Sequence, residues 1–433
     1  MGLASGHNAG SERTARDAAA QIVRVLQDAG YVAYFAGGCV RDMLLGQDAA
    51  DYDVATDAHP EQVLEQFRSA RLVGEAFGVA LVRMYRHDVE VATFRIESGY
   101  VDGRHPDHVA YSDAEHDAQR RDFTINGMFY DPVADAVHDY VSGQLDLERK
   151  VIRAIGDPGQ RFADDYLRLL RAVRFSARLR FEIEAATAAA IEAHASMLDR
   201  ISRERIGMEI EMMMSNASRA RAAEMLQRFG LDGPTLNEST LAGDLACLSA
   251  LDDSADYPSA LAGWLVDRHL CPGEASDVAG LIDALRGMKS VQLARRWRAA
   301  LVLSNEQRQA LAGLLKQLPV ALDWENLNVA QRKRLLARDD WAALHGLRRA
   351  VERRQGGPRR DEAAMERQIE SLVAEGVAPA PLLSGHDLIN AGFEPGPAFK
   401  RLLEQVYDAQ LMGEVRDVAA ATALARKLAG GGD

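Results

Sequence analysis

YFAGGCVRDMLLGQDAADYDVA (residues 34–55) is the stretch that decides the fold of the first part of the chain. A strand-like run ends in a Gly-Gly pair, a short helix follows with Arg41 in its first turn, and a second strand then carries Asp51 and Asp53. Residues two apart on a strand point to the same face, so both carboxylates are expected to aim at one spot. Carboxylates suit a divalent cation, and the glycines and the arginine suit the phosphates that accompany one. Nucleotidyl transfer is therefore the leading hypothesis.

The two aspartates are the predicted catalytic residues and metal ligands. Hard oxygen ligands can hold a pair of Mg²⁺ ions roughly 3.5–4 Å apart, one activating the attacking hydroxyl and one steadying the leaving pyrophosphate. An isolated D-x-D is usually a solvated strand end, and here the neighbouring glycines and Arg41 favour function. Glu90, on the strand-like run DVEVATFR, is either a third carboxylate of this site or an ordinary exposed strand residue.

Gly37, Gly38 and Arg41 are the first predicted nucleotide-binding residues. Glycines let the backbone approach phosphate oxygens closely, and the start of the following helix offers free N–H groups. Arg41 adds a charged donor fork. Further along, RRDFTINGMFYDP places Arg121 and Asp122 where they can hold a triphosphate and a ribose hydroxyl. The alternative for these two residues is a buried Arg–Asp pair.

The pattern of apolar residues predicts an α+β fold, with a small mixed α/β head followed by helices. A chain of 433 residues is expected to form two to four structural units. From residue 157 onward almost every segment has helical spacing. The polar residues 98–113 are expected to form a long mobile loop. In the head, helices are expected at residues 14–29 and 59–67, and strands at residues 31–36, 52–55, 79–85 and 89–95.

Composition and charge limit the possible classes of protein. Hydrophobic residues at 47% and charged residues at 27% are globular values. The chain lacks an apolar run long enough to cross a bilayer, and its start lacks the core of a secretory signal. Three scattered cysteines without a CxxC pair argue against a zinc site and predict a cytoplasmic location. A formal net charge of −13 argues against a broad nucleic-acid coat but allows a focused basic groove.

DPGQRFADDYLRLLRAVRFSARLRF (residues 157–181) is the second decisive stretch. Asp165 and Arg168, three residues apart on the expected helix, are predicted to share a face, and Arg171 and Arg174 continue the row. An ordinary surface salt bridge, which contributes under about 1 kcal/mol, is the alternative for such a pair. Four charged residues in one row beside an apolar stripe favour a ligand-facing surface.

An Asp–Arg pair of this kind can distinguish nucleobases. Cytosine and adenine each present an amino donor beside a ring-nitrogen acceptor, so an Asp oxygen accepts from the amino group while an Arg N–H donates to the ring. Uracil and guanine present the opposite pattern and leave buried polar groups unpaired, at a cost of about 1–3 kcal/mol each. Side chains can therefore select C and A without a nucleic-acid template.

Five ordered motifs resemble the class II tRNA nucleotidyltransferase and bacterial poly(A) polymerase family: GGCVRD, DYDVAT, RRDFTIN, IGDPGQRF and DDYLRLLRAVRF. The resemblance covers residues 31–214, and residues 381–415 are similar to the C-terminal segment of many bacterial members. It implies a polymerase-β-like nucleotidyltransferase head (residues 1–145), a helical neck with the base-reading helix (146–225), a helical body (226–350) and a tRNA-contacting helical tail (351–433).

The resemblance also implies roles for individual residues and for partners. Asp51 and Asp53 would bind Mg²⁺, while Asp165 and Arg168 would read the base of the incoming nucleotide. The remaining positions would hold the nucleotide: Gly37, Gly38, Arg41, Arg121, Asp122, Arg171 and Arg174. Members of the family add CCA, or part of it, to tRNA 3′ ends, or add poly(A) to RNA. The expected activity is template-independent CCA addition from CTP and ATP, and addition of the terminal A alone or of poly(A) is the alternative.

Two departures from the family pattern bear on this choice. The usual Glu-Asp of the base-reading motif is Asp164-Asp165 here, followed by Tyr166, so the helix entry is expected to differ while base choice is kept. The basic R-R-F segment of many bacterial poly(A) polymerases is absent, and GEAFGVALV (residues 74–82) takes its place. Residues 98–113 match a loop that is missing from relatives that add only C. The absence of the R-R-F segment and the presence of this loop both favour full CCA addition.

Three basic clusters in the second half are candidates for contacts with tRNA phosphates: residues 295–298, 331–338 and 347–360. For any one of them, a solvated helix face is the simpler interpretation. Rival interpretations are a nucleotidyltransferase for small molecules or proteins and a catalytically inactive RNA-binding protein. The base-choosing row and the paired aspartates argue against these. The sequence does not fix the oligomeric state.

Overall fold

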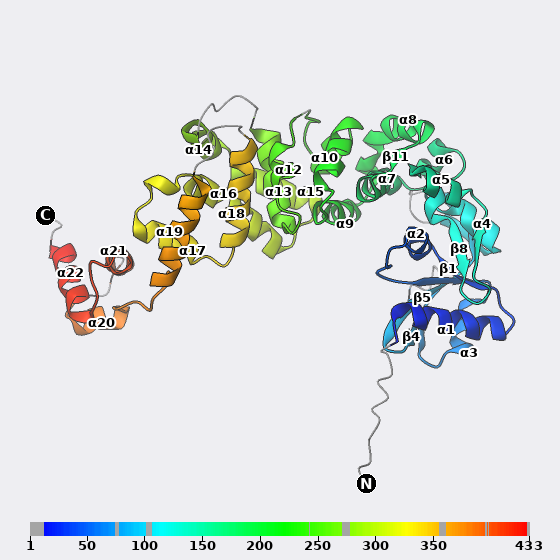
Figure 1. Cartoon of the computed structure of the whole chain (residues 1–433), viewed down its shortest axis with the longest axis horizontal. Coiled ribbons are helices and arrows are strands. Elements are labelled where there is room, and N and C mark those ends of the chain that lie inside the picture. Colours follow the sequence, from blue (N-terminus) through cyan, green and yellow to red (C-terminus); the bar gives the residue numbers. More distant parts are fainter. Residues whose placement is uncertain are drawn as a thin grey trace, which may run out of the picture. The chain divides into compact units, whose positions relative to one another are not determined.

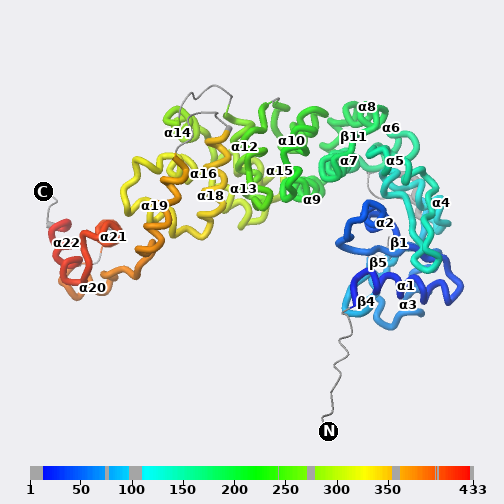
Figure 2. The backbone as a smooth tube through the Cα atoms, viewed as in Figure 1, coloured from blue at the N-terminus to red at the C-terminus, as the bar shows by residue number. Residues whose placement is uncertain are grey.

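The computed structural model (Figures 1 and 2) describes residues 13–73, 78–100, 106–241, 243–270, 278–354, 361–394, 396 and 398–430. The chain divides into two compact units. The first comprises Met1–Met213 and Glu224–Thr240, and the second comprises Met214–Ala223 and Leu241–Asp433. The first part of the chain forms a mixed sheet with helices, and the rest is helical. This arrangement confirms the predicted α+β class. The finer division into head, neck, body and tail stays a prediction.

A seven-stranded sheet forms the centre of the head, in the order β3-β4-β5-β2-β1-β8-β9. The pairing of β2 with β5 is parallel, and the other neighbours in the sheet are antiparallel. The strands expected from the sequence are present, whereas β3, β8 and β9 were not expected. The bounds are Ala33–Ala36 (β1), Asp53–Thr56 (β2), Ala70–Leu72 (β3), Val79–Met84 (β4), His87–Thr93 (β5), Met128–Asp131 (β8) and Ala136–Asp139 (β9).

Helix α1 (Ala15–Asp28) confirms the first predicted helix and contacts β1, β2 and β5. Its N-terminus is fixed by a capping box between Thr14 and Asp17, which satisfies free N–H groups at the helix start. Helix α3 (Pro60–Gln66) lies against α1 and the β3-β4-β5 edge. The side of the sheet that carries Ala36 and Phe129 packs against α4 (Ala114–Arg120) through a separate apolar cluster.

Residues 98–113 do not form the expected long loop. Strands β6 (Arg95–Tyr100) and β7 (Pro106–Tyr111) pair as an antiparallel hairpin, in register from Arg95 opposite Tyr111 to Tyr100 opposite Pro106. The polar composition of these residues had suggested a loop. Backbone hydrogen bonds can stabilise a two-stranded ribbon even when both of its faces are polar. Residues 101–105 lie outside the described residues, as do residues 74–77 of the GEAFGVALV segment.

The rest of the first unit is mainly helical, and helix α10 (Arg219–Arg228) has residues in both units, since the division falls after Ala223. The bounds are Gly38–Leu44 (α2), Gly143–Arg149 (α5), Pro158–Asp164 (α6), Leu167–Leu179 (α7), Ala185–His194 (α8), Arg203–Met214 (α9), Arg219–Arg228 (α10) and Asp232–Leu236 (α11), with short strands Val151–Ile152 (β10) and Glu182–Ile183 (β11) and the 3-10 turns Thr124–Asn126 (η2) and Ala195–Arg200 (η3). The buried side of α7 includes Leu170, Val173 and Ala177, as its apolar spacing predicted.

The second unit consists of helices in the described part of the chain. Helix α13 contacts α12, α16 and α18, and the edge-on contact of Trp264 with Trp297 lies in its core. The last three helices share a small core of their own that includes Leu388, Val406 and Ala421. The bounds are Ala246–Ala250 (α12), Tyr257–His269 (α13), Val278–Gly287 (α14), Ser290–Leu301 (α15), Asn305–Leu322 (α16), Trp324–Asn326 (η4), Val329–Leu336 (α17), Trp341–Arg354 (α18), Glu362–Glu375 (α19), Gly385–Asn390 (α20), Ala398–Leu411 (α21) and Val418–Gly430 (α22).

Among the described residues, no helix has both the length and the apolar character needed to span a bilayer.

Candidate active site

One pocket of about 530 Å³ brings together every predicted site residue except Asp51. All of its lining residues belong to the first unit. They come from α2 and the turn before it, the start of β2, the end of α4 and the residues after it as far as η2, the segment joining α6 to α7, α7 itself, and α9. The lining also includes residues that the sequence interpretation missed: Arg120, Asn126, Leu167, Phe175, Arg178 and Arg205.

The turn before α2 brings the backbone close to the pocket. Gly37 has φ 76°, in the left-handed region that favours glycine, and a Cβ placed there would lie 3.2 Å from Nη1 of Arg121. Arg41 is buried, and its Nε donates to Asp42 Oδ1 at 2.8 Å. Its Nη1 donates to Asn126 Oδ1 at 2.7 Å. Two partners therefore hold the Arg41 guanidinium in place in the pocket wall.

A carboxylate cluster lies at the edge of the pocket where β2 begins. Asp53 is the first residue of β2 and lines the pocket, while Asp51 precedes the strand. Parallel pairing of Val54 with Val91 makes Asp53 and Glu90 adjacent on neighbouring strands, on the same face. Burial raises the pKa of Asp53 to about 6, with further contributions from the charges of Asp51 and Glu90, even though the residue keeps contact with solvent. Three negative charges thus gather at one point.

Two arginines at the end of α4 share one buried aspartate. Asp117 is 1% exposed and accepts from Arg120 Nη2 at 2.7 Å and from Arg121 Nη2 at 3.0 Å. The guanidinium of Arg121 also lies over the Phe129 ring, 4.9 Å from its centroid. Arg121 is therefore paired with Asp117 and not with Asp122, the partner that the sequence alternative had named.

Asp165 does not lie on a helix with Arg168, so that part of the prediction is wrong. Helix α6 ends at Asp164, Asp165 is extended with φ −157° and ψ 106°, and α7 begins at Leu167. Oδ1 of Asp165 accepts from the Leu167 backbone N–H at 3.0 Å, which occupies a free donor at the start of α7. The two side chains still line the same pocket, because the chain turns between the two helices.

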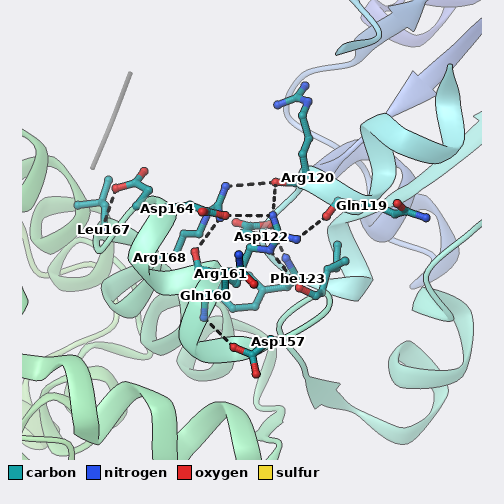
Figure 3. A network of polar contacts seen from close by, with 12 residues as sticks. Gln119, Arg120, Asp122, Phe123, Asp157, Gln160, Arg161, Asp164, Leu167 and Arg168 are labelled. Atoms are coloured by element: carbon teal, nitrogen blue, oxygen red, sulfur yellow. Dashed lines mark hydrogen bonds and ion pairs between the residues drawn. The ribbon is translucent and has the colours of Figure 1, made fainter. Parts of the chain in front are cut away.

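Arg161 and Arg168 hold this turn against the end of α4 (Figure 3). Arg168 donates to the carbonyls of Arg161, at 2.8 Å, and Arg120, at 3.2 Å. Arg161 donates to the carbonyls of Gln119 and Arg120 at 2.6 and 3.1 Å. Charged donors on main-chain oxygens are strong hydrogen bonds. The segment that joins α6 to α7 is thereby tied to the end of α4.

Arg205 from α9 pairs with Asp165 through two hydrogen bonds. Nη1 donates to Oδ1 at 3.1 Å and Nη2 donates to Oδ2 at 2.6 Å, which is the bidentate geometry of a strong Arg–carboxylate pair. The sequence signal for this partner was weak, since Arg205 lies 40 residues from Asp165 and only the fold brings them together.

A chain of ion pairs runs from Asp122 through α7 to α9. Arg171 Nε donates to Asp122 Oδ2 at 2.7 Å, and Arg174 Nε donates to Glu209 Oε2 at 2.7 Å. Arg171 also lies 3.8 Å from Glu209 Oε1, so Glu209 joins the two arginines. Asp122 accepts from the Phe123 backbone N–H as well and is 7% exposed. Arg171 and Arg174 therefore share a face of α7, as predicted, with Glu209 as an unpredicted partner.

We expect Asp122→Asn to lower the free energy of unfolding by about 2 kcal/mol at pH 7. Burial acts to raise the pKa of Asp122, but the charges of Arg171 and Arg168 outweigh it and lower the pKa to about 2. A lowered folded-state pKa gives stability that is present above the unfolded value, 3.8, and is lost as the pH falls through 2.

The free energies of unfolding of the parent protein and of Asp122→Asn should therefore become more similar as the pH falls from about 4 toward 2. Urea unfolding at pH 7 and at pH 3.5 measures it, with Asp28→Asn, an exposed position at the end of α1, as the control. A gap that is equal at both values of pH would contradict the assignment of this stability to the Asp122 charge.

Of the three predicted basic clusters, the structure leaves the first most exposed. Arg295, Arg296 and Arg298 are exposed around the buried Trp297. In the second cluster, Lys333 and Arg334 are paired with carboxylates at 3.2 and 2.6 Å. In the third, the described side chains include Arg348, which is fully buried between Glu352 and Glu362, and Arg349, which pairs with Asp252 at 2.8 Å. Residues 355–360 of that cluster lie outside the described residues.

His345, Glu362 and Glu366 form a group of side chains that could hold a metal ion in the second unit. Arg348 Nη2 already lies 2.6 Å from Glu362 and 2.9 Å from Nε2 of His345. A cation is thus already present between these ligand atoms. We interpret the group as an ion-pair cluster that ties α18 to α19.

Comparison with known proteins places this geometry in a family. Residues 33–153 match the family model described as the poly A polymerase head domain, and residues 180–235 match the probable RNA and SrmB-binding site of polymerase A. The CCA-adding enzyme of Lactobacillus delbrueckii subsp. bulgaricus is 32% identical over 405 residues, which cover 93% of this chain and 95% of that protein. This chain belongs to the CCA-adding enzyme family. The family predicted from the sequence motifs is thereby confirmed.

Other members of the CCA-adding enzyme family agree in sequence and fold. The enzyme of Lactobacillus helveticus is 44% identical over 193 residues, which cover 44% of this chain and about half (48%) of that protein. The crystal structure of the Bacillus stearothermophilus CCA-adding enzyme in complex with CTP has a TM-score of 0.75 at 27% identity, covering 96% of this chain and 98% of that one. The Thermotoga maritima enzyme complexed with tRNA shares the fold, with a TM-score of 0.63 at 19% identity and coverage of 94% of each chain.

Proposed function

We propose that this protein adds C and A nucleotides to the 3′ end of tRNA without a template, using CTP and ATP and releasing pyrophosphate. One observation carries the proposal: a single pocket holds a carboxylate of the head beside the Asp165–Arg168 base-reading pair. Nucleotidyl transfer needs the carboxylate, which can hold a metal ion. The choice of C and A without a template needs the Asp165–Arg168 pair. Family membership and the CTP complex of the Bacillus stearothermophilus relative support the same activity.

Asp51 and Asp53 are the proposed catalytic residues and Mg²⁺ ligands, with Glu90 as a third carboxylate. These residues suit Mg²⁺ because carboxylate oxygens are the ligands that this ion prefers. The position of the carboxylates also suits this ion, because the parallel pairing of β2 with β5 places Asp53 beside Glu90, and the charges of Asp51 and Glu90 add to the effect of burial in raising the pKa of Asp53. When bound, Mg²⁺ would supply charge stabilisation for the attacking and leaving oxygens.

The phosphates of the incoming nucleotide are assigned to the turn before α2 and to the arginines opposite it. Gly37 and Gly38 leave room for phosphate oxygens near the backbone, and a Cβ at Gly37 would crowd Arg121. Arg41 and Arg121 are already positioned by Asp42, Asn126 and Asp117, so little side-chain entropy remains to be lost on binding. Asp122, Arg171 and Arg174 complete this wall.

Base selection is assigned to Asp165 and Arg168. Asp165 would accept from the amino group of cytosine or adenine, and Arg168 would donate to the adjacent ring nitrogen. Before the nucleotide binds, both side chains have protein partners, Arg205 for Asp165 and two main-chain carbonyls for Arg168. Reading the base therefore requires an exchange of hydrogen bonds, and the cost of this exchange is met only by a base with matching groups.

The RNA partner would contact basic residues outside the pocket. Arg295, Arg296 and Arg298 are the strongest of the predicted positions, because their side chains are exposed. Recognition would depend on RNA shape and backbone and not on sequence. The cytoplasmic location stays a prediction, with which the free, buried thiol of Cys39 is consistent.

A defined set of tRNAs tests the proposal. Transcripts that end at the discriminator base, at C and at CC are each incubated with one of the four nucleotides or with all of them, and the products are sequenced. We expect C, C and A to be added in that order and synthesis to stop at CCA. Long A tracts would indicate a poly(A) polymerase, and activity on CC-ended tRNA alone would indicate an A-adding enzyme.

A further inference from the structure

One cation of the pocket, Arg178, has no ion-pair partner among the described residues. Every other arginine of the pocket lies within 3.5 Å of a carboxylate: Asp42, Asp117, Asp122, Asp164, Asp165 or Glu209. Arg178 lines the same pocket, is exposed, and makes no ion pair or side-chain hydrogen bond within the described part of the chain. An arginine with all of its donors free in a pocket for phosphorylated ligands can bind one further anionic group.

The position of Arg178 is fixed by α7. It lies seven residues after Arg171 and four after Arg174, so the three guanidinium groups share one side of the helix. Arg178 stands one turn beyond the residues that contact Glu209 of α9. It is therefore at the end of the row, farther along α7 from Asp165 than the residues that would hold the incoming nucleotide.

Helix α9 contacts α7 through Glu209 and also carries exposed methionines. Arg205 contacts Asp165 before the start of α7, and Glu209 contacts Arg171 and Arg174 further along, so the two helices run in the same direction. One turn beyond Glu209 is Met212, on the side of α9 that faces the arginine row. Met212 is 44% exposed and Met208, four residues before it, is 64% exposed.

A guanidinium without an ion pair among the described residues on α7, and exposed thioethers near Glu209 on α9, supply the two parts that recognise one nucleotide of a strand. The guanidinium binds a backbone phosphate and the methionines provide apolar surface for a base. Methionine side chains are flexible and adapt to surfaces of different shape. Adaptability suits a site whose occupant changes at each step, because the RNA terminus is the discriminator base first, then C, then a second C.

We propose that Arg178, Met208 and Met212 form the subsite for the 3′-terminal nucleotides of the RNA substrate. This inference rests on the proposed function, which requires the RNA terminus to enter the pocket. Arg178 binds a phosphate of the terminal nucleotides, and the two methionines pack against a base. The subsite is separate from the residues assigned to the incoming nucleotide, so its loss weakens RNA binding and leaves nucleotide binding nearly intact.

Steady-state kinetics of the first C addition test the subsite, with a tRNA transcript lacking CCA and with CTP varied separately. We expect Arg178→Ala to raise the KM for tRNA by about tenfold while the KM for CTP changes less than about twofold. The salt dependence of tRNA binding should become shallower, by a slope of about 0.7, because one phosphate contact is lost. Arg178→Lys should recover part of the affinity, since the charge remains.

The methionines need their own variants and controls. Met208→Ala with Met212→Ala should raise the KM for tRNA by about threefold, and Met212→Leu should stay close to the parent because its apolar surface is kept. Arg200→Ala and Leu145→Ala, at exposed positions of the same unit outside the pocket, are the matched controls.

The outcomes separate the two proposals. If the parent protein adds C to tRNA and Arg178→Ala leaves the KM for tRNA and the salt slope unchanged, the subsite is wrong and the proposed function stands. An equal rise in the KM for tRNA and for CTP also overturns the subsite, because Arg178 would then bind the nucleotide. If the parent protein adds no nucleotide to tRNA, the proposed function fails and the subsite fails with it.

Discussion

Asp53→Asn is expected to slow nucleotide addition by roughly a thousand-fold, without unfolding the protein. The substitution keeps the size of the side chain and removes the negative charge that is proposed to hold the metal ion. Asp53 lines the pocket, and its pKa is raised by burial first and then by the charges of Asp51 and Glu90. Asp51→Asn should have an effect of similar size, and Glu90→Gln a smaller one if Glu90 is only a peripheral ligand.

Single-turnover addition of C to tRNA, with Mg²⁺ titrated, measures these effects. Asp48→Asn is the matched control, because Asp48 is an exposed carboxylate in the same segment, outside the pocket. Thermal unfolding of each variant in the absence of metal shows whether the fold is kept. An Asp53→Asn protein that adds C at the parental rate would show that the reaction takes place elsewhere.

Arg168→Ala is expected to reduce the preference for CTP over UTP by roughly a hundred-fold. In the proposed mechanism the parent enzyme rejects uracil because the uracil carbonyl would face the Asp165 carboxylate and its ring N–H would face an Arg168 donor. Each unpaired buried group costs about 1–3 kcal/mol, and removal of Arg168 removes one of these mismatches together with the favourable bond to cytosine. The preference for ATP over GTP should fall for the same reason.

The ratio of kcat/KM for CTP to that for UTP, measured on one tRNA transcript, gives the effect. Asp165→Asn should produce a similar loss of selectivity, since an amide can donate as well as accept. Arg149→Ala, at an exposed position of the same unit outside the pocket, is the control. Loss of overall rate with an unchanged CTP-to-UTP ratio would show that Arg168 holds the nucleotide without reading its base.

The site could be predicted to a large extent from the sequence because its residues come from short motifs. The Gly-Gly turn, Arg41 and Asp53 are separated by few residues, so local rules of strands and helices place them correctly. The row of Arg168, Arg171 and Arg174 follows from the spacing of α7. The family resemblance added the link between the two motifs, which lie more than 100 residues apart.

The partners of these residues could not be predicted, because they come from other parts of the fold. Arg205 and Glu209 are on α9, and Asp117 is on α4, and no local pattern ties them to Asp165, Arg174 or Arg121. The break between α6 and α7 was missed for a different reason. Apolar spacing continues through residues 162–170, whereas the extended backbone at Asp165 is stabilised by Arg205 and by the α7 N-terminus.

The hairpin of β6 and β7 was also missed, because its sequence was interpreted as a loop. Its residues are polar and include glycine, so their composition favoured a loop. Backbone pairing between two neighbouring segments does not require an apolar face, and it leaves little periodic signal in the sequence. Strands β1, β2, β4 and β5 of the central sheet, by contrast, contain buried apolar residues, and these four were found from the sequence.

A crystal structure with CTP bound would show whether side chains take the place of a template. We expect Asp165 to accept a hydrogen bond from the cytosine amino group and Arg168 to donate one to the adjacent ring nitrogen, with the release of at least one of their hydrogen bonds to Arg205, Arg161 or Arg120. A cytosine edge that points away from both side chains, with the Asp165–Arg205 pair and the Arg168 carbonyl contacts intact, would contradict this expectation.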